Sequence, residues 1–190
     1  MAYVQLPILV SYSTRTGSTG EVAEFIAEVL REAQVPVEVA RMRDLKTFTQ
    51  YKAAILGAPL YMRGMPGEVS RFLHRHRHEL AALPTWVFIL GPVRGLPWEF
   101  RQAGEKAGKQ LERTHWFHPA EVKVVGGRLD VNNLPFPLNL AQHLPVPGKD
   151  LPPTDVRNWD DIRAWTSTIA DKLGLTNGAR NDEASVLSAI

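Results

Sequence analysis

The sequence contains no cysteine among its 190 residues. This absence excludes disulfide bonds, thiolate nucleophiles and cysteine–zinc sites. It also disfavours iron–sulfur clusters, because cysteine thiolates hold such clusters. Any redox chemistry of this chain would therefore depend on a bound organic cofactor.

Long hydrophobic runs are also missing. No segment approaches the roughly 20 apolar residues of a membrane-spanning helix, and residues 1–6 lack the basic region of a signal peptide. We therefore expect no membrane span and a cytoplasmic protein.

An excess of one charge is absent as well, since 22 Lys and Arg accompany 20 Asp and Glu, for a formal net charge of +2. This excess is too small to indicate a nucleic-acid partner, and we expect none.

Hydrophobic residues make up 44% of the chain, which suits one domain with a single core. Strand and helix signals alternate along it. We expect strands at residues 7–12, 35–40, 51–58, 85–90 and 121–126, and helices at 17–32, from 66 onward, at 98–114 and at 159–173. This alternation predicts a parallel sheet that is covered by helices on both faces and joined by right-handed crossovers.

The alternation is interrupted at residues 129–153, which contain six prolines. We interpret this segment as an irregular insertion in a domain that spans residues 1–175. Long segments of this kind in compact domains are usually functional or disordered. Apolar side chains such as Leu134 and Phe136 suit a lid over a ligand, a docking surface or a peripheral membrane contact. Residues 176–190 are small and polar, and we predict a flexible tail.

The strongest functional signal lies between the first expected strand and the first expected helix. Free N–H groups and the dipole at a helix N-terminus favour an anion, a glycine lets the backbone approach it closely, and hydroxyls add donors. The candidate phosphate-binding residues are Ser13, Thr14, Arg15, Thr16, Gly17, Ser18 and Thr19. The loop has neither the Gly-Lys-Ser/Thr of a P-loop nor a G-x-G-x-x-G fingerprint. A Ser/Thr-rich helix cap without any ligand is the alternative.

Residues 14–19 resemble the flavodoxin signature T-x-T-G-x-T at every fixed position. Arg15 is similar to the Ser-Thr-Arg form found in the group that includes the menaquinone-dependent protoporphyrinogen dehydrogenases. The resemblance implies a flavodoxin-like three-layer α/β/α sandwich with a five-stranded parallel sheet of order 2-1-3-4-5. That order is the known flavodoxin order, with FMN at its switch point, and we adopt it from the family. The resemblance also implies that the loop binds the FMN phosphate.

Two further loops are candidates for the flavin ring. The stretch at residues 57–61 resembles the family's Gly-Ala-Pro-x-Tyr loop, and Tyr61 is an aromatic face that could stack on an isoalloxazine or simply lie at the surface. The candidates in this loop are Ala58, Pro59, Leu60, Tyr61, Met62, Arg63 and Gly64. Those in the loop after the fourth strand are Gly91, Pro92, Val93, Arg94 and Gly95. Trp98 fits either ring stacking or ordinary packing.

Three histidines, His74, His76 and His78, suggest a metal site. On a helix only His74 and His78 share a face, and no nearby carboxylate pair completes a site. We therefore predict a solvated basic helix end and no metal, although His76 would share one helix face with Val69 and Phe72.

The resemblance implies FMN-dependent electron transfer with a redox partner protein or a quinone, either as a simple carrier or as a quinone-linked oxidoreductase similar to protoporphyrinogen dehydrogenase. One alternative is a flavodoxin-fold binding or structural module that has lost FMN. Another is a response-regulator-like signalling domain of the same topology. That domain needs acids after the first strand and an aspartate ending the third, where this chain has Ser13 with Thr14 and Gly57 with Ala58.

Overall fold

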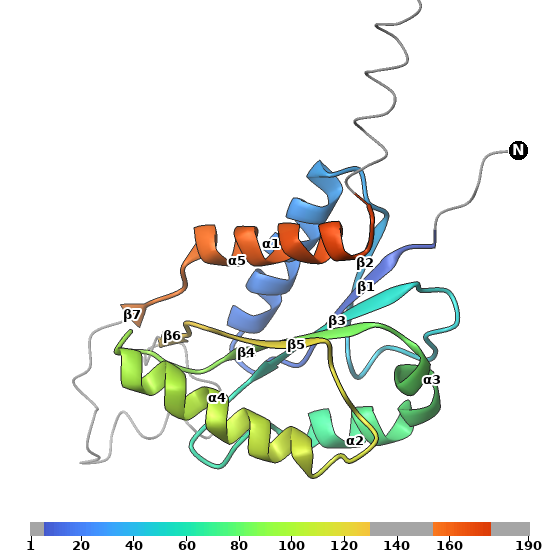
Figure 1. Cartoon of the computed structure of the whole chain (residues 1–190). Coiled ribbons are helices and arrows are strands. Elements are labelled where there is room, and N and C mark those ends of the chain that lie inside the picture. The colour runs from blue at the N-terminus through green and yellow to red at the C-terminus, as the bar shows by residue number, and fades with distance from the viewer. Residues whose placement is uncertain (1–5, 130–153, 176–190) are drawn as a thin grey trace, which may run out of the picture.

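A computed structural model describes residues 6–129 and 154–175. Its centre is a five-stranded parallel sheet in the order β2-β1-β3-β4-β5, between two layers of helices (Figure 1). The strands are β1 (Ile8–Tyr12), β2 (Val37–Arg41), β3 (Ala53–Pro59), β4 (Thr85–Leu90) and β5 (Glu121–Val125). The helices are α1 (Ser18–Glu32), α2 (Gly67–Arg75), α3 (Arg77–Ala82), α4 (Pro97–Glu112) and α5 (Trp159–Lys172). The predicted sandwich and strand order are confirmed.

Each face of the sheet buries its own hydrophobic core. Successive side chains of a strand point to opposite faces, so Ile8 and Val10 join the core under α1 and α5, whereas Leu9 joins the core under α2, α3 and α4. Figure 1 shows these two groups of helices on opposite sides of the sheet. The three central strands are buried almost throughout, as expected for a parallel sheet that is covered on both faces.

The helix expected from residue 66 is two helices. Pro66 caps α2, and the backbone turns at His76 (φ −102°, ψ 21°) before α3 begins. His76 is buried on the face that it shares with Val69 and Phe72, so the prediction of a solvated helix end is wrong for this residue. Its Nδ1 lies 2.7 Å from Glu79 Oε2. Burial opposes ionisation of Glu79, but hydrogen bonds from the Phe48 amide, His76 and the Thr47 hydroxyl outweigh it and lower the pKa of Glu79 below 4.5. This cluster fixes the loop before β3 onto the break between the two helices.

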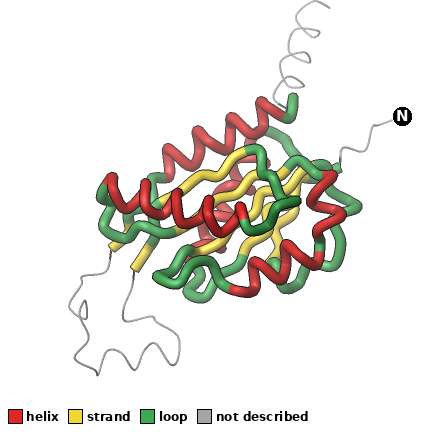
Figure 2. The backbone as a smooth tube through the Cα atoms, turned by 60° about the horizontal axis from the view of Figure 1, so that its bottom comes forward, coloured by secondary structure: helices red, strands yellow, loops and turns green. Residues whose placement is uncertain are grey.

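A second, small sheet was not predicted. Strands β6 (Arg128–Leu129) and β7 (Thr154–Asp155) pair in antiparallel fashion. Leu129, which the sequence placed at the start of an irregular insertion, therefore lies in a strand and pairs with Thr154. Figure 2 shows the two strands side by side at one end of the main sheet. Residues 130–153 and the predicted tail at 176–190 lie outside the described residues.

The described helices include none that is both long enough and apolar enough to cross a membrane.

Candidate functional site

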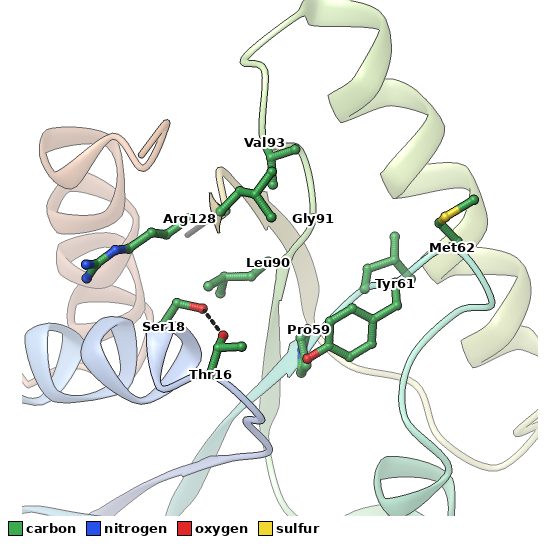
Figure 3. A pocket seen from close by; sticks show the side chains of 12 residues that line it. Thr16, Ser18, Pro59, Tyr61, Met62, Leu90, Gly91, Val93 and Arg128 are labelled. Atoms are coloured by element: carbon green, nitrogen blue, oxygen red, sulfur yellow. Dashed lines mark hydrogen bonds between the residues drawn. The ribbon is translucent and has the colours of Figure 1, made fainter. Parts of the chain in front are cut away.

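Three loops meet at the carboxyl ends of β1, β3 and β4 and surround a cavity of about 530 Å³ (Figure 3). The volume lies within the range of small-molecule sites, and the position is the switch point at which parallel sheets of this order bind ligands. The residues lining the cavity are Thr16, Ser18, Pro59, Leu60, Tyr61, Met62, Leu90, Gly91, Val93, Gly127, Arg128 and Leu129.

The loop between β1 and α1 forms the polar end of this cavity. Gly17 has φ +94°, a left-handed conformation that glycine adopts without strain, and its amide donates to Thr14 Oγ1 over 2.9 Å. The hydroxyls of Thr16 and Ser18 lie 3.5 Å apart at the cavity (Figure 3). Gly17 is the N-cap of α1 and provides no side-chain acceptor for the first helical turn. The start of α1 is therefore open to an anionic acceptor from a ligand.

Thr19 gives a second sign of a polar ligand at this end. Its side chain is 1% exposed, and its Oγ1 has no hydrogen-bond partner within the described part of the chain. Buried polar atoms are normally paired, so Thr19 has, among the described residues, an unsatisfied hydroxyl in the first turn of α1, although Thr19 itself does not line the cavity. Ser13 differs, because its buried hydroxyl donates to Glu68 Oε2 over 2.7 Å. The Ser13 hydroxyl is thus already occupied by a protein partner.

The loop after β3 forms the apolar wall. Tyr61 and Gly64 exchange two backbone hydrogen bonds, of 3.1 and 2.9 Å, across a tight turn in which Gly64 has φ +107°. Figure 3 shows the Tyr61 ring beside Pro59, with Met62 directed away from it. Burial raises the pKa of the Tyr61 phenol, and the nearby Arg15 guanidinium only partly opposes this effect. The Tyr61 side chain is thus an uncharged aromatic surface at neutral pH. The Arg15 guanidinium lies 5.4 Å from the centroid of its ring.

Helix α4 supports this wall from behind. Lys106 Nζ donates to the carbonyl oxygen of Tyr61 over 3.0 Å and also to that of Met62. Gln110 Oε1 accepts the amide of Met65 over 2.8 Å. These two side chains hold the turn in place without lining the cavity. The sequence analysis missed both, because nothing in a helical Lys or Gln indicates a loop 45 residues earlier in the chain.

The loop after β4 closes the opposite side of the cavity through Gly91 and Val93. The carbonyl oxygen of Pro92 accepts the amide of Gly127 over 2.6 Å, which ties this loop to the end of β5. A Cβ on Gly127 would lie 3.2 Å from the same oxygen. Arg94 lines no part of the cavity. Its Nε lies 3.0 Å from Glu99 Oε1, so the charge of Arg94 has a carboxylate partner.

A family model described as a flavodoxin domain matches residues 9–137. This chain belongs to the flavodoxin domain family. The protoporphyrinogen IX dehydrogenase [quinone] of Escherichia coli K12 is 26% identical over 125 residues, which are 64% of this chain and 68% of that protein.

Two solved structures show the flavodoxin fold. An archaeal flavodoxin has a TM-score of 0.53 at 15% identity and covers 88% of this chain and 99% of its own. The rubredoxin:oxygen oxidoreductase of Desulfovibrio gigas has a TM-score of 0.53 at 16% identity. The alignment covers 90% of this chain but only 38% of that longer protein. At these identities, the likeness concerns the fold alone.

The flavodoxin domain brings together eight of the residues that the sequence singled out. Those that line the cavity are Thr16, Ser18, Pro59, Leu60, Tyr61, Met62, Gly91 and Val93. The other candidates in the three loops, which do not line it, are Ser13, Thr14, Arg15, Gly17, Thr19, Ala58, Arg63, Gly64, Pro92, Arg94 and Gly95. Several of these shape the loops through backbone conformation, since Gly17, Gly64 and Gly95 all have positive φ. Trp98 is 46% exposed and lies under the Arg94 guanidinium, outside the cavity lining.

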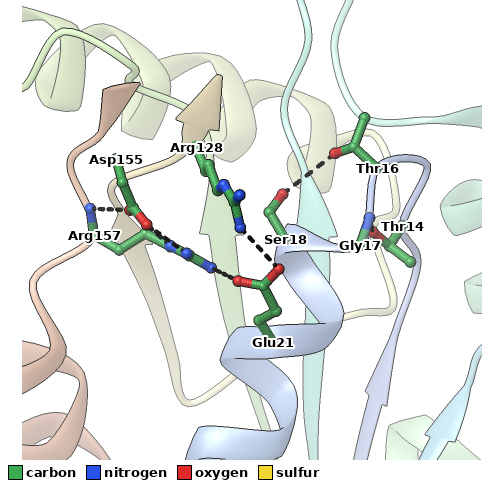
Figure 4. Close-up of polar contacts among 8 residues, drawn as sticks. All are labelled: Thr14, Thr16, Gly17, Ser18, Glu21, Arg128, Asp155 and Arg157. Atoms are coloured by element: carbon green, nitrogen blue, oxygen red, sulfur yellow. Dashed lines mark hydrogen bonds and ion pairs between the residues drawn. The ribbon is translucent and has the colours of Figure 1, made fainter. Parts of the chain in front are cut away.

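The fourth wall of the cavity in this flavodoxin domain was missed. Gly127, Arg128 and Leu129 line it after β5. Figure 4 shows how this wall is attached to α1: Glu21 lies between Arg128, at 3.3 Å, and Arg157, at 2.7 Å. There was little signal in the sequence here, because no residue type at these positions indicated a ligand.

Proposed function

We propose that this chain binds one FMN non-covalently in the cavity between the three loops and uses it to transfer electrons to or from a redox partner protein or a quinone. The observation that carries the proposal is that one cavity combines a polar end at the start of α1 with an apolar, aromatic wall at Tyr61. FMN has the same division into a dianionic phosphate and a flat ring.

The polar end suits the phosphate. Thr16 and Ser18 present hydroxyls at the cavity, and the first turn of α1 has no side-chain cap. The unpartnered hydroxyl of Thr19 lies in the same turn. Phosphate oxygens accept hydrogen bonds from hydroxyl and amide groups, so we assign this end of the cavity to the FMN phosphate.

The apolar end suits the ring. Tyr61, Pro59 and Leu60 lie on one side, and Gly91 and Val93 on the other. We assign Tyr61 to the stacking face, with Lys106 and Gln110 keeping its turn in position. Bound FMN would supply the one- and two-electron chemistry, while the chain would set its position and electrostatic environment.

The choice of a quinone as one electron partner rests on the relative from Escherichia coli, whose name includes a quinone. A small electron-carrier role rests on the archaeal flavodoxin, which shares the fold. We propose to separate these roles by mixing reduced, FMN-loaded protein anaerobically with a quinone, and by testing protoporphyrinogen as a donor. Rapid reoxidation by quinone and reduction by protoporphyrinogen support the enzyme, whereas reaction with neither supports a protein-specific carrier.

The binding proposal is tested by the visible absorption spectrum of the purified protein and by titration with FMN. We expect flavin bands and a saturable, one-to-one complex. Thr16→Ala should weaken FMN binding about tenfold, because it removes one hydrogen bond to a charged group. Thr49→Ala is the matched control, since Thr49 is also an exposed threonine whose hydroxyl contacts another hydroxyl, that of Thr47. A colourless protein that takes up no added FMN would overturn the proposal and favour a module without flavin.

A further inference from the structure

A second cavity, of about 430 Å³, is lined by Arg15, whose guanidinium lies over the Tyr61 ring of the first cavity. It is lined by four arginines, Arg15, Arg43, Arg71 and Arg75, from the loop after β1, the segment after β2 and helix α2. Arg71 and Arg75 are four residues apart on α2 and therefore share one helical face. Three separate segments of the chain thus contribute arginines to the lining of one cavity.

The four arginines of this cavity outnumber the two acids close to it, Glu68 and Asp44. Glu68 also lines it, and its carboxylate accepts the Ser13 hydroxyl. Asp44 lies 3.7 Å from Arg43 in an exposed pair. Within the described residues, no ion pair is formed by Arg15, Arg71 or Arg75. The whole chain carries a formal charge of only +2, so this concentration of positive charge is a local feature.

The position of the cavity connects it with the flavin site. The Arg15 guanidinium lies over the Tyr61 ring, 5.4 Å from its centroid, and Tyr61 lines the first cavity. A ligand group held by Arg15 would therefore lie next to the wall that we assign to the flavin ring. The start of α2 adds to the positive potential, because Gly67 lines the cavity and α2 has no side-chain N-cap.

We propose that this cavity binds the oxyanion groups, phosphate or carboxylate, of a small molecule that exchanges electrons with the flavin. The guanidinium fork binds both groups through paired hydrogen bonds. A hollow of this volume suits an inserted small-molecule group rather than the flat acidic face of a protein. The anion-binding part stands on the four arginines alone, and the electron-exchange part rests on the proposed FMN function.

Isothermal titration calorimetry on FMN-saturated protein tests the anion site, with inorganic pyrophosphate and tricarballylate as separate probes at low salt. We expect saturable one-to-one binding of at least one probe. The double variant Arg71→Gln with Arg75→Gln should weaken it about tenfold or more. Arg77→Gln is the matched control, because Arg77 is an exposed arginine two residues from Arg75 that does not line the cavity. Tighter pyrophosphate binding assigns a phosphate-bearing ligand, and tighter tricarballylate binding assigns a carboxylate-bearing one.

The result that overturns the proposal is no saturable binding of either probe, or equal weakening by Arg77→Gln. Binding of poly-glutamate without binding of either small probe would also overturn it and indicate an acidic protein partner. The link to the flavin has its own readout: a saturating probe should shift the visible flavin spectrum, and the double variant should abolish this shift. If the protein binds no FMN at all, the probes are titrated into the Thr16→Ala variant instead. This substitution weakens the α1 loop as a competing anion site, so binding of the probes still tests the arginine-lined cavity.

Discussion

Arg157 is expected to be the most important charged side chain for keeping the fourth wall of the cavity in place. Only 3% of its side chain is exposed, and it contacts Asp155 at 2.5 Å, Glu21 at 2.7 Å and the Trp159 ring at 4.7 Å. Its neighbour Val156 donates its amide to the carbonyl oxygen of Gly127, which lines the cavity. We predict that Arg157→Ala destabilises the protein and weakens FMN binding together.

The expected loss of stability depends on how exposed the carboxylate partners of Arg157 are. Glu21 and Asp155 are 45% and 42% exposed, so water can solvate their carboxylates once the arginine is gone, and Glu21 keeps Arg128. The cost should therefore fall between the ~0–1 kcal/mol of an exposed pair and the ~3–5 kcal/mol of a broken buried pair. We expect about 2 kcal/mol, which corresponds to a fall of roughly 4–8 °C in Tm for a chain of this size.

Urea denaturation at neutral pH measures this loss, with Arg163→Ala as the matched control. Arg163 also pairs with a glutamate of α1, Glu32, and also lies over an aromatic ring, that of Phe25, but its side chain is 45% exposed. We expect no resolvable change in the denaturation midpoint for the control. Equal midpoints for the two variants would refute the argument, because burial is the main difference between the two arginines.

The difference in stability between wild type and Arg157→Ala should depend on pH. The hydrogen bond from Arg157 lowers the pKa of Asp155 below 3.8 and outweighs the opposing effect of burial. The stabilisation is therefore complete above pH 3.8 and is lost as the pH falls through the lower pKa of the folded protein. The gap between wild type and Arg157→Ala should narrow in that acid range. A gap that widens there would contradict the assignment of Asp155 as the partner.

Three further changes have expected outcomes. Gly57→Ala would place a Cβ 2.1 Å from Phe88 Cζ inside the sheet, so a loss of about 1–3 kcal/mol in unfolding free energy is expected from overpacking; an unchanged denaturation curve would contradict this. Gly17→Ala meets no atom within 4 Å, so its cost of about 1–2 kcal/mol would come from the left-handed backbone, and calorimetric titration should show weaker FMN binding. Glu79→Gln should destabilise the protein by about 1 kcal/mol at neutral pH, and this difference should shrink as the pH falls from 4.5 through the lowered pKa of Glu79 in the folded protein. A difference that persists in acid would show that its charge is not involved.

The strands and the first cavity loops were predictable because both depend on local patterns, whereas the order of the strands came from the family resemblance. Short apolar runs such as residues 85–90 are typical of strands in a parallel sheet that is covered on both faces, and this run forms one. The loop at residues 13–19 combines a glycine with hydroxyl residues directly before a helix, and this pattern has a physical function wherever it occurs. The switch-point rule then brings the loops after β1, β3 and β4 together without any knowledge of side-chain contacts.

The missed parts of the site depend on contacts between distant residues. Lys106 and Gln110 hold the Tyr61 turn from α4, and Glu21 holds Arg128 and Arg157 from α1. In the sequence these are ordinary charged or polar helix residues, because a partner 45 or 136 positions away leaves no periodic signal.

The break at His76 has the same origin in distant contacts. Its spacing placed it on the face of Val69 and Phe72, but its burial was missed because it depends on a distant contact. The turn at His76 accompanies its hydrogen bond to Glu79, whose other partners include Phe48 in another loop. Eight cavity-lining residues were thus predicted, whereas the residues that support their loops were missed, since ligand chemistry restricts residue type but support restricts only geometry. By this reasoning, loss of Lys106 should alter the affinity for the flavin ring more than that for its phosphate, since its contacts are confined to the Tyr61 turn.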